Sequence, residues 1–304
     1  MAFDKKQLNI CAIIAVRNEF QYLRILLPML AKQNIDVVII DNESTDRSHE
    51  LYSELMGKPV IMIETLPYRG FFSLSDQLKA KEKIYKTINH DWIVHHDADE
   101  IMEHFSPGKT LRDAIHEADE LGCNVINFDE FVFLPLPGTD YFNDDYYKGI
   151  LRYYFFEPSK NRLNRAWKRT SNFINAASGG HTLEGGDMSF VPKNHILRHY
   201  IVLSEEHARK KYLNRSFDDV DLTHGWHGNR RGFTQENLLL PENNIFLHQL
   251  ERYDSKEFYR SVPASKHFWQ WGSNRPQAGN LSRRCGSIKK RLARSLGWRY
   301  SKIK

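Results

Sequence analysis

The apolar positions of the first hundred residues form short continuous runs that alternate with helically spaced stretches. Continuous apolar runs of a few residues are typical of strands covered on both faces of a parallel sheet. Apolar residues spaced by three and four positions indicate helices with one buried face. The predicted elements are strands at 8–16, 36–40, 60–64 and 92–95 and helices at 20–33, 48–56 and 74–88. Strands that alternate with helices favour an α/β fold with a mostly parallel sheet flanked by helices.

The pattern becomes less regular beyond residue 110. The predicted elements there are helices at 111–121 and 204–215 and strands at 124–128, 131–134 and 193–200. Ser204 is placed to cap the helix that follows it, because a serine oxygen can accept a hydrogen bond from the first turn. The stretch 135–168 is rich in Tyr, Phe, Asn and Asp, and its pattern predicts no element.

The composition is that of an ordinary globular protein, with 41% hydrophobic and 27% charged residues among 304. No apolar run approaches the roughly 20 residues that span a bilayer. The first residues lack the apolar centre of a signal peptide, so we expect a cytoplasmic protein. The three cysteines, Cys11, Cys123 and Cys285, lie far apart and predict neither a disulfide framework nor a metal motif.

The net charge of +5 is concentrated at the C-terminal end. The stretch 283–304 has nine basic residues and no acidic residue, so the remainder of the chain is net acidic. Apolar residues recur at every fourth position from Ile288, which is typical of a basic amphipathic helix on an anionic membrane surface. A disordered basic tail is the alternative. Nucleic-acid binding is disfavoured, because the body is acidic and no known nucleic-acid motif is present.

Polar clusters follow three of the four predicted parallel strands, at 17–19, 41–46 and 97–100. The carboxyl ends of parallel strands meet at one edge of a sheet, where α/β proteins bind ligands. We therefore expect these clusters to converge on one site.

The cluster after the fourth strand contains Asp97 and Asp99, two residues apart. In an extended segment their side chains would point the same way and could face one cation. Carboxylate oxygens suit Mg²⁺ or Mn²⁺. The alternative is a solvated acidic loop, and the position after the fourth strand favours the metal site. By the same alternation His95, and not His96, would share the face of Asp97.

The cluster after the second strand begins with Asp41, whose carboxylate could accept a hydrogen bond from a base N–H. Ser44, Thr45 and Asp46 are explained by helix capping.

The three clusters together, Arg-Asn-Glu, Asp-Asn-x-Ser-Thr-Asp and Asp-Ala-Asp-Glu, resemble those of family 2 glycosyltransferases over residues 8–135. The resemblance implies a GT-A fold (a Rossmann-like sheet with flanking helices), a nucleotide-diphosphate sugar donor of UDP or GDP type, Mn²⁺ or Mg²⁺, and an inverting single displacement. The implied organisation is a catalytic domain at 1–215 with its nucleotide-sugar half at 8–135, a less regular C-terminal extension at 216–282 and the tail at 283–304.

The resemblance also implies roles for individual residues. Asp41 would contact the base, and Asp97 and Asp99 would hold the metal and the donor diphosphate. The remaining donor-binding candidates are Val16, Asn18, Glu19, Asn42, Arg69 and Ala98. Many relatives have a second acid where this chain has Asn42, so the base stays open. An ordinary surface arginine is the alternative for Arg69.

The C-terminal half supplies the remaining candidates. GT-A enzymes often recruit a histidine from this part as a further metal ligand, and His199 and His181 are the two candidates. A carboxylate or histidine must take the proton of the acceptor hydroxyl. The candidate bases are Asp129, Glu130, Glu184 and Asp187.

The predicted function is transfer of a sugar to a glycan or lipid-linked acceptor in surface polysaccharide synthesis, with the protein peripheral on the inner membrane face. A sugar-nucleotide nucleotidyltransferase is one alternative, but it would need a glycine-rich loop after the first strand, where Arg17-Asn18-Glu19 stands. A phosphatase would carry its Asp-x-Asp after the first strand. A non-catalytic glycan-binding subunit of GT-A fold is the other alternative. Metal binding that depends on the donor would distinguish the enzyme from such a subunit.

Overall fold

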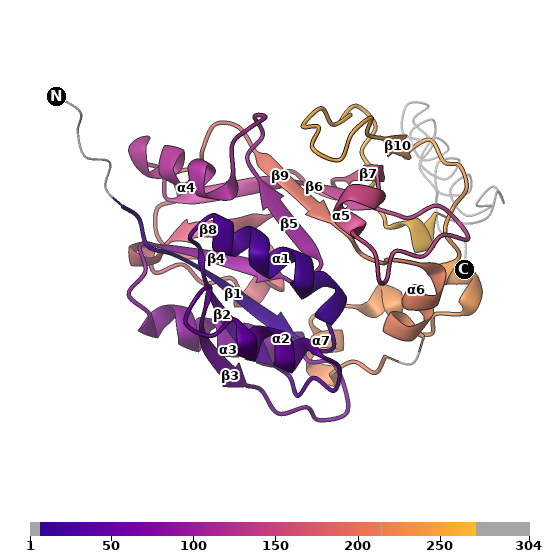
Figure 1. Ribbon diagram of the computed structural model, residues 1–304, viewed down its shortest axis with the longest axis horizontal. Coiled ribbons are helices and arrows are strands. Elements are labelled where there is room, and N and C mark those ends of the chain that lie inside the picture. Colours follow the sequence, from indigo (N-terminus) through magenta and orange to yellow (C-terminus); the bar gives the residue numbers. More distant parts are fainter. Residues whose placement is uncertain (1–6, 214, 272–304) are drawn as a thin grey trace, which may run out of the picture. The chain divides into compact units, whose positions relative to one another are not determined.

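The computed structural model describes residues 7–213 and 215–271 (Figure 1). The chain divides into two compact units, 1–268 and 269–304, and the architecture below is that of the first. The predicted basic tail and Cys285 lie outside the described residues. Cys11 and Cys123 are buried free thiols.

The first half of the unit is the predicted alternation of strands and helices. Its strands are β1 (Ile10–Val16), β2 (Asp36–Asp41), β3 (Val60–Thr65) and β4 (Trp92–Asp97), and its helices are α1 (Phe20–Lys32), α2 (Ser48–Glu54) and α3 (Leu74–Thr87). The strands are parallel in the order β4-β1-β2-β3. The predicted α/β fold is thus confirmed, and each of these elements lies within two residues of its expected bounds.

The central strands β1 and β2 are almost entirely apolar because both faces of the sheet are covered there (Figure 1). The edge strand β3 is mostly exposed. Ile10, Ala12 and Ile14 of β1 pack in the core that contains α1 and α4 (Leu111–Glu120). Cys11 and Ile13 point the other way, into the core that contains α3. Burial at about 25 cal/mol per Å² of apolar surface on both sides makes this sheet the rigid base of the site.

The second half of the sheet is mostly antiparallel. Its strands are β5 (Glu100–Glu103), β6 (Val125–Phe133), β7 (Arg152–Phe156), β8 (Asn164–Lys168), β9 (His195–His199) and β10 (His248–Gln249). β8 joins β4 to the start of β6, while the end of β6 pairs with β7 and runs parallel to β9. β5 pairs with β9, which brings Glu100 opposite His199.

One sequence prediction in this half was wrong in detail. The strands expected at 124–128 and 131–134 are one strand, β6, because Asp129 and Glu130 stay in the ladder, paired with Ile196 and Leu197 of β9. The stretch without an assignment holds β7 and β8, and all five residues of β7 are buried.

The helical elements of the C-terminal half are short. They are α5 (Tyr146–Gly149), α6 (Glu205–Tyr212), α7 (Asp219–Thr223) and the 3-10 turns Arg169–Ser171, Ala176–Ser178, Gly228–Arg230, Gln235–Leu238 and Phe268–Gln270. Ser204 caps α6 by accepting from His207 N at 3.1 Å, as predicted. No helix among residues 7–213 and 215–271 is long and apolar enough to cross a membrane.

Candidate active site

The loops after β1 and β2 are tied together at the expected edge of the sheet. Asn18 adopts a left-handed conformation (φ 58°), and its Oδ1 accepts from Thr45 N at 2.6 Å. Ser44 Oγ accepts from Asn18 N at 3.1 Å, and Ser44 N donates to Asp41 Oδ1 at 3.0 Å. Ser44 and Thr45, which were predicted to cap a helix, therefore form hydrogen bonds that join the loop after β1 to the loop after β2. These bonds hold the ends of both strands in place.

Asp41 and Asn42 lie at the end of β2 and are 6% and 5% exposed. Asn42 N donates to Val16 O at 2.8 Å, and its side-chain amide donates to Leu66 O at 2.9 Å. The buried end of β2 is thus held by both neighbouring strands, and the Asp41 carboxylate has one oxygen bonded to its own loop.

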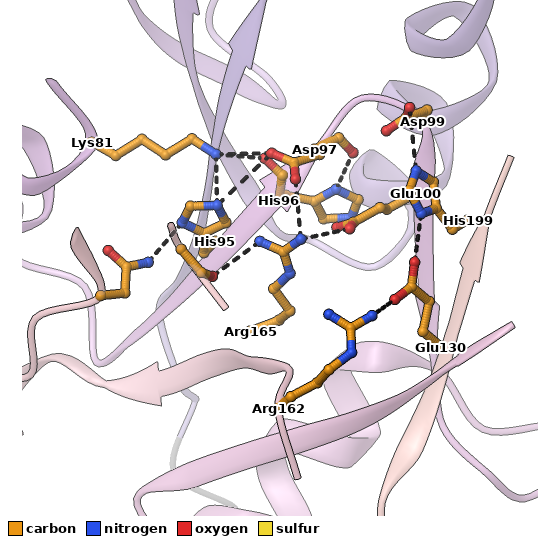
Figure 2. Close-up of polar contacts among 12 residues, drawn as sticks. Lys81, His95, His96, Asp97, Asp99, Glu100, Glu130, Arg162, Arg165 and His199 are labelled. Atoms are coloured by element: carbon orange, nitrogen blue, oxygen red, sulfur yellow. Dashed lines mark hydrogen bonds and ion pairs between the residues drawn. The ribbon is translucent and has the colours of Figure 1, made fainter. Parts of the chain in front are cut away.

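Asp97, at the end of β4, lies between two buried cations (Figure 2). Lys81 Nζ lies 3.2 Å from its Oδ1, and Arg165 Nη2 lies 3.1 Å from its Oδ2. Burial raises the pKa of Asp97, but the charges of Lys81 and Arg165 outweigh it and hold that pKa well below its usual value. Asp97 is therefore ionised and neutralised by the protein itself.

The same cations reach further groups around Asp97. Lys81 Nζ lies 3.1 Å from His95 Nε2, and Asn175 lies 2.8 Å from the other ring nitrogen. Burial and the Lys81 charge lower the pKa of His95 well below its usual value, so its ring is neutral. Arg165 also pairs with Glu100 at 2.7 Å, although burial raises the pKa of that carboxyl to about 7.

Asp99 faces a different set of groups. Its Oδ2 lies 2.8 Å from Lys211 Nζ and 3.5 Å from His199 Nε2. The extended geometry expected for 97–99 was wrong, because β4 ends at Asp97 and Ala98 and Asp99 form a turn. The two carboxylates consequently diverge, as Figure 2 shows, and they share no partner among the described residues.

His199 connects Asp99 to Glu130. Its Nδ1 lies 2.7 Å from Glu130 Oε1, while Glu130 Oε2 pairs with Arg162. Burial lowers the pKa of His199, but the Asp99 charge outweighs it and the pKa is raised. Glu130 is 5% exposed, and its two carboxylate oxygens are both paired, one with the His199 ring and the other with Arg162. Its carboxylate is therefore placed to orient the His199 ring.

The donor atoms around Asp99 suit a divalent ion in part. No group of three His, Cys, Asp or Glu side chains converges within the described part of the chain. A histidine that bonds a carboxylate through one ring nitrogen presents the other to a metal, and this is the arrangement of Glu130 and His199. Asp99 and His199 could thus hold an ion whose other ligands come from a donor diphosphate and water. Asp97 is less available, since two buried cations hold it.

The other predicted donor-site residues lie at different depths. Ala98 is buried in the turn, and Glu19 precedes α1. Burial raises the pKa of Glu19 to about 7. Arg69, in the loop after β3, pairs with Asp76 and Asp218, so a phosphate contact would require these pairs to open. His181 is exposed, and its backbone O accepts from Asn164 N at 2.8 Å.

The candidate bases divide into two pairs. Asp129 accepts from Asn194 at 2.9 Å and from Arg260 at 2.8 Å, and Glu130 is paired as described. Glu184 and Asp187 are exposed in the loop after His181. The structure therefore brings only Glu130 into contact with the Asp99 cluster.

Four basic residues that pair with carboxylates of the site, Lys81, Arg162, Arg165 and Lys211, were not predicted. Lys81 could have been found, because it stands with Leu78, Ile84 and Tyr85 on the buried face of α3, where an unpaired ammonium would be costly. Arg165 and Lys211 have no such pattern around them. Their partners are 68 and 112 residues away in the chain.

Comparison with known proteins places this geometry in context. Residues 11–178, more than half of the chain, match the family described as "Glycosyl transferase family 2". No curated protein matches the chain significantly.

Similar solved structures are distant. S. aureus TarS is 13% identical over 76% of this chain and 42% of its own, with a TM-score of 0.42. TarS 1–349 in complex with UDP-GlcNAc is 14% identical over 76% and 70%, with a TM-score of 0.41. GlyE of Streptococcus pneumoniae TIGR4 is 13% identical over 40% and 30%, with a TM-score of 0.25. The chain thus spans less than half of the TarS chain.

Proposed function

The chain belongs to glycosyl transferase family 2, and on this premise we propose that it moves a sugar from a nucleotide-diphosphate sugar to a glycan or lipid-linked acceptor by an inverting displacement. The observation that carries the proposal is that the matched region brings Asp41, Asp97 and Asp99 to one edge of a parallel sheet. That edge is where α/β folds bind nucleotides. The family membership also disfavours a nucleotidyltransferase.

The nucleotide half of the donor is proposed to lie over the ends of β1 and β2. Asp41 would accept a hydrogen bond from the base, and Val16, Asn18 and Glu19 would line the pocket. The hydrogen bonds between the loops after β1 and β2 support this assignment, because they preorganise the pocket before the nucleotide binds. A UDP or GDP donor is the expectation to test.

The diphosphate is proposed to lie at Asp99. Asp99 and His199 would hold Mn²⁺ or Mg²⁺, which supplies positive charge to the leaving nucleoside diphosphate. Glu130 would keep Nε2 of His199 directed to that position. Lys81 and Arg165 would hold the Asp97 carboxylate, and with it the end of β4, in place.

The proton acceptor is proposed to be Glu184. Asp129 and Glu130 are each bonded to an arginine, so neither is free to take a proton from a hydroxyl. Glu184 is exposed, as a group that meets an acceptor sugar must be. Asp187 is exposed too, but it lies beside Asn124, which bonds Lys168 opposite the start of β4, at the other end of that strand from Asp97. The acceptor would meet the C-terminal half, and location on the inner membrane face through the basic tail is part of the proposal.

The proposal is tested by incubating the protein with a panel of UDP-, GDP- and CDP-sugars, Mn²⁺ and saccharide acceptors, and measuring released nucleoside diphosphate. One donor should be turned over, and Glu184→Gln should lower kcat by about 10²-fold or more. Asp129→Asn serves as the control that leaves kcat nearly unchanged. Nucleotide binding without turnover of any donor would support the glycan-binding subunit instead.

A further inference from the structure

Lys211 lies inside the candidate donor site although it comes from the C-terminal half. It stands on α6, and its side chain is 10% exposed. Its ammonium lies 2.8 Å from Asp99 Oδ2 and 3.4 Å from Ile201 O, and 5.1 Å from the centre of the Tyr22 ring. The counter-charge of this enclosed ammonium comes first from Asp99 and next from Glu19.

The oxygen that Lys211 holds is the one that faces His199. Lys211 Nζ and His199 Nε2 both approach Asp99 Oδ2, at 2.8 and 3.5 Å. A divalent ion bound between Asp99 and His199 would meet the ammonium at close range. Two cations a few Å apart in a partly desolvated site repel strongly.

We propose that Lys211 competes with the metal for Asp99 and moves to the donor diphosphate when the metal binds. Lys211 is then a positioning residue that keeps Asp99 neutralised in the free enzyme and makes metal binding depend on the nucleotide. The inference rests on the proposed function only for the second step. The first step, competition at Asp99, is a property of the free protein.

If Lys211 competes with the metal, removing it changes the metal affinity in the opposite direction to that expected for a purely structural lysine. Removing a competing cation strengthens binding of the metal, whereas removing a structural contact weakens that binding or leaves it unchanged. Because coupling between two ligands is reciprocal, the nucleoside diphosphate should also strengthen binding of the metal to the wild-type protein. Without Lys211, that dependence on the nucleotide should be smaller.

The test is titration of Mn²⁺ alone into the full chain, with free Mn²⁺ followed by electron paramagnetic resonance. Lys211→Met should bind Mn²⁺ at least tenfold more tightly than wild type, and Lys211→Arg, which keeps the charge, should bind it as weakly as wild type. The adjacent Lys210, which is exposed and pairs with Glu206, provides the matched control Lys210→Met, with no change expected. Lys211→Gln is the second neutral variant if Lys211→Met does not fold.

The site of the gained binding is fixed by Asp99→Asn in the Lys211→Met background, which should abolish the gain. The inference is overturned if the neutral Lys211 variants bind Mn²⁺ no more tightly than wild type, or if the gain survives Asp99→Asn. A gain in Mn²⁺ affinity with no response to UDP, GDP or CDP in any variant would uphold the competition and count against the proposed function. Nucleotide binding without a gain in Mn²⁺ affinity in the neutral Lys211 variants would support the proposed function and overturn the competition.

Discussion

At the scale of single residues, Arg198 shows how a buried charge is accommodated away from the donor site. It lies in β9 with 0% exposure, and its guanidinium bonds Glu103 at 2.6 Å and Ser255 O at 2.8 Å. Phe133, Tyr147 and Phe258 surround it at 5.3–5.4 Å. Removing Arg198 would leave Glu103 with Lys256, whose Nζ lies 2.6 Å from Glu103 Oε2, as its remaining counter-charge. The loss should therefore be smaller than the about 3–5 kcal/mol that is typical of a buried charge left unpaired.

We therefore expect Arg198→Met to lower the free energy of unfolding by about 2–3 kcal/mol in urea titrations. Arg209 is the matched control, since it pairs only at the surface with Glu205 and Glu206. Arg209→Met should change stability by less than about 1 kcal/mol. Equal effects of the two substitutions would show that the buried pair contributes no more than a surface pair.

Glu130 offers a second test at this scale. If it orients His199 toward a metal, Glu130→Gln should weaken Mn²⁺ binding in the presence of nucleotide by about tenfold, as losses of such outer partners do. Nucleoside binding without metal should be unaffected. Asp129→Asn, one position away on the other face of β6, should leave Mn²⁺ affinity unchanged. Unaltered Mn²⁺ affinity in Glu130→Gln would remove His199 from the proposed ligand set.

The sequence located the ends of the strands but not the directions of the side chains there. Asp97 and Asp99 were placed correctly at the end of a fourth strand, and their divergence was missed because the turn at Ala98 leaves no mark in the apolar pattern. Lys81 differs, because a lysine on the apolar stripe of a helix is itself visible in sequence. Its partner Asp97 was already identified.

At the scale of elements, the start of α3 is held by α7. Asp221 of α7 is 0% exposed and accepts from Leu74 N at 2.5 Å and from Ser75 N at 3.0 Å. These are first-turn amides of α3 that its own cap, Ser73, does not reach. A short helix of the C-terminal half thus fixes the element that carries Lys81.

Asp221→Ala should therefore lower the free energy of unfolding by about 2–3 kcal/mol, since two buried N–H groups lose a charged acceptor. Asp219, exposed on the same helix, provides the control Asp219→Ala, for which less than about 0.5 kcal/mol is expected. Chemical denaturation followed by circular dichroism measures both. A loss in Asp221→Ala no larger than in the control would mean that water satisfies these amides.

Elements were predictable where their burial depends on their own residues. The central strands β1 and β2 are nearly continuous apolar runs, because both faces of the sheet are covered there. β5 was missed because two of its four residues are glutamates. Their buried charges are paired with basic residues far along the chain, Arg165 for Glu100, and Arg198 and Lys256 for Glu103. No local pattern reports such pairing.

At the scale of the whole molecule, the candidate site is assembled from both halves of the described unit. The parallel half supplies Asp41, Asp97 and Asp99, and the later half supplies His199 and Lys211. The family match ends at residue 178, before these last two. Donor binding should therefore depend on contacts that lie beyond the matched region.

The most direct test of this account is the thermal stability of the full chain with UDP, GDP, CDP and ADP, each with and without Mn²⁺, for wild type and Asp99→Asn. A ligand that binds the native state raises the melting temperature. We expect one nucleoside diphosphate to stabilise wild type in a Mn²⁺-dependent manner, and Asp99→Asn to lose that dependence. No stabilisation by any nucleotide, with or without Mn²⁺, would contradict the assignment of this edge of the sheet as a sugar-nucleotide site.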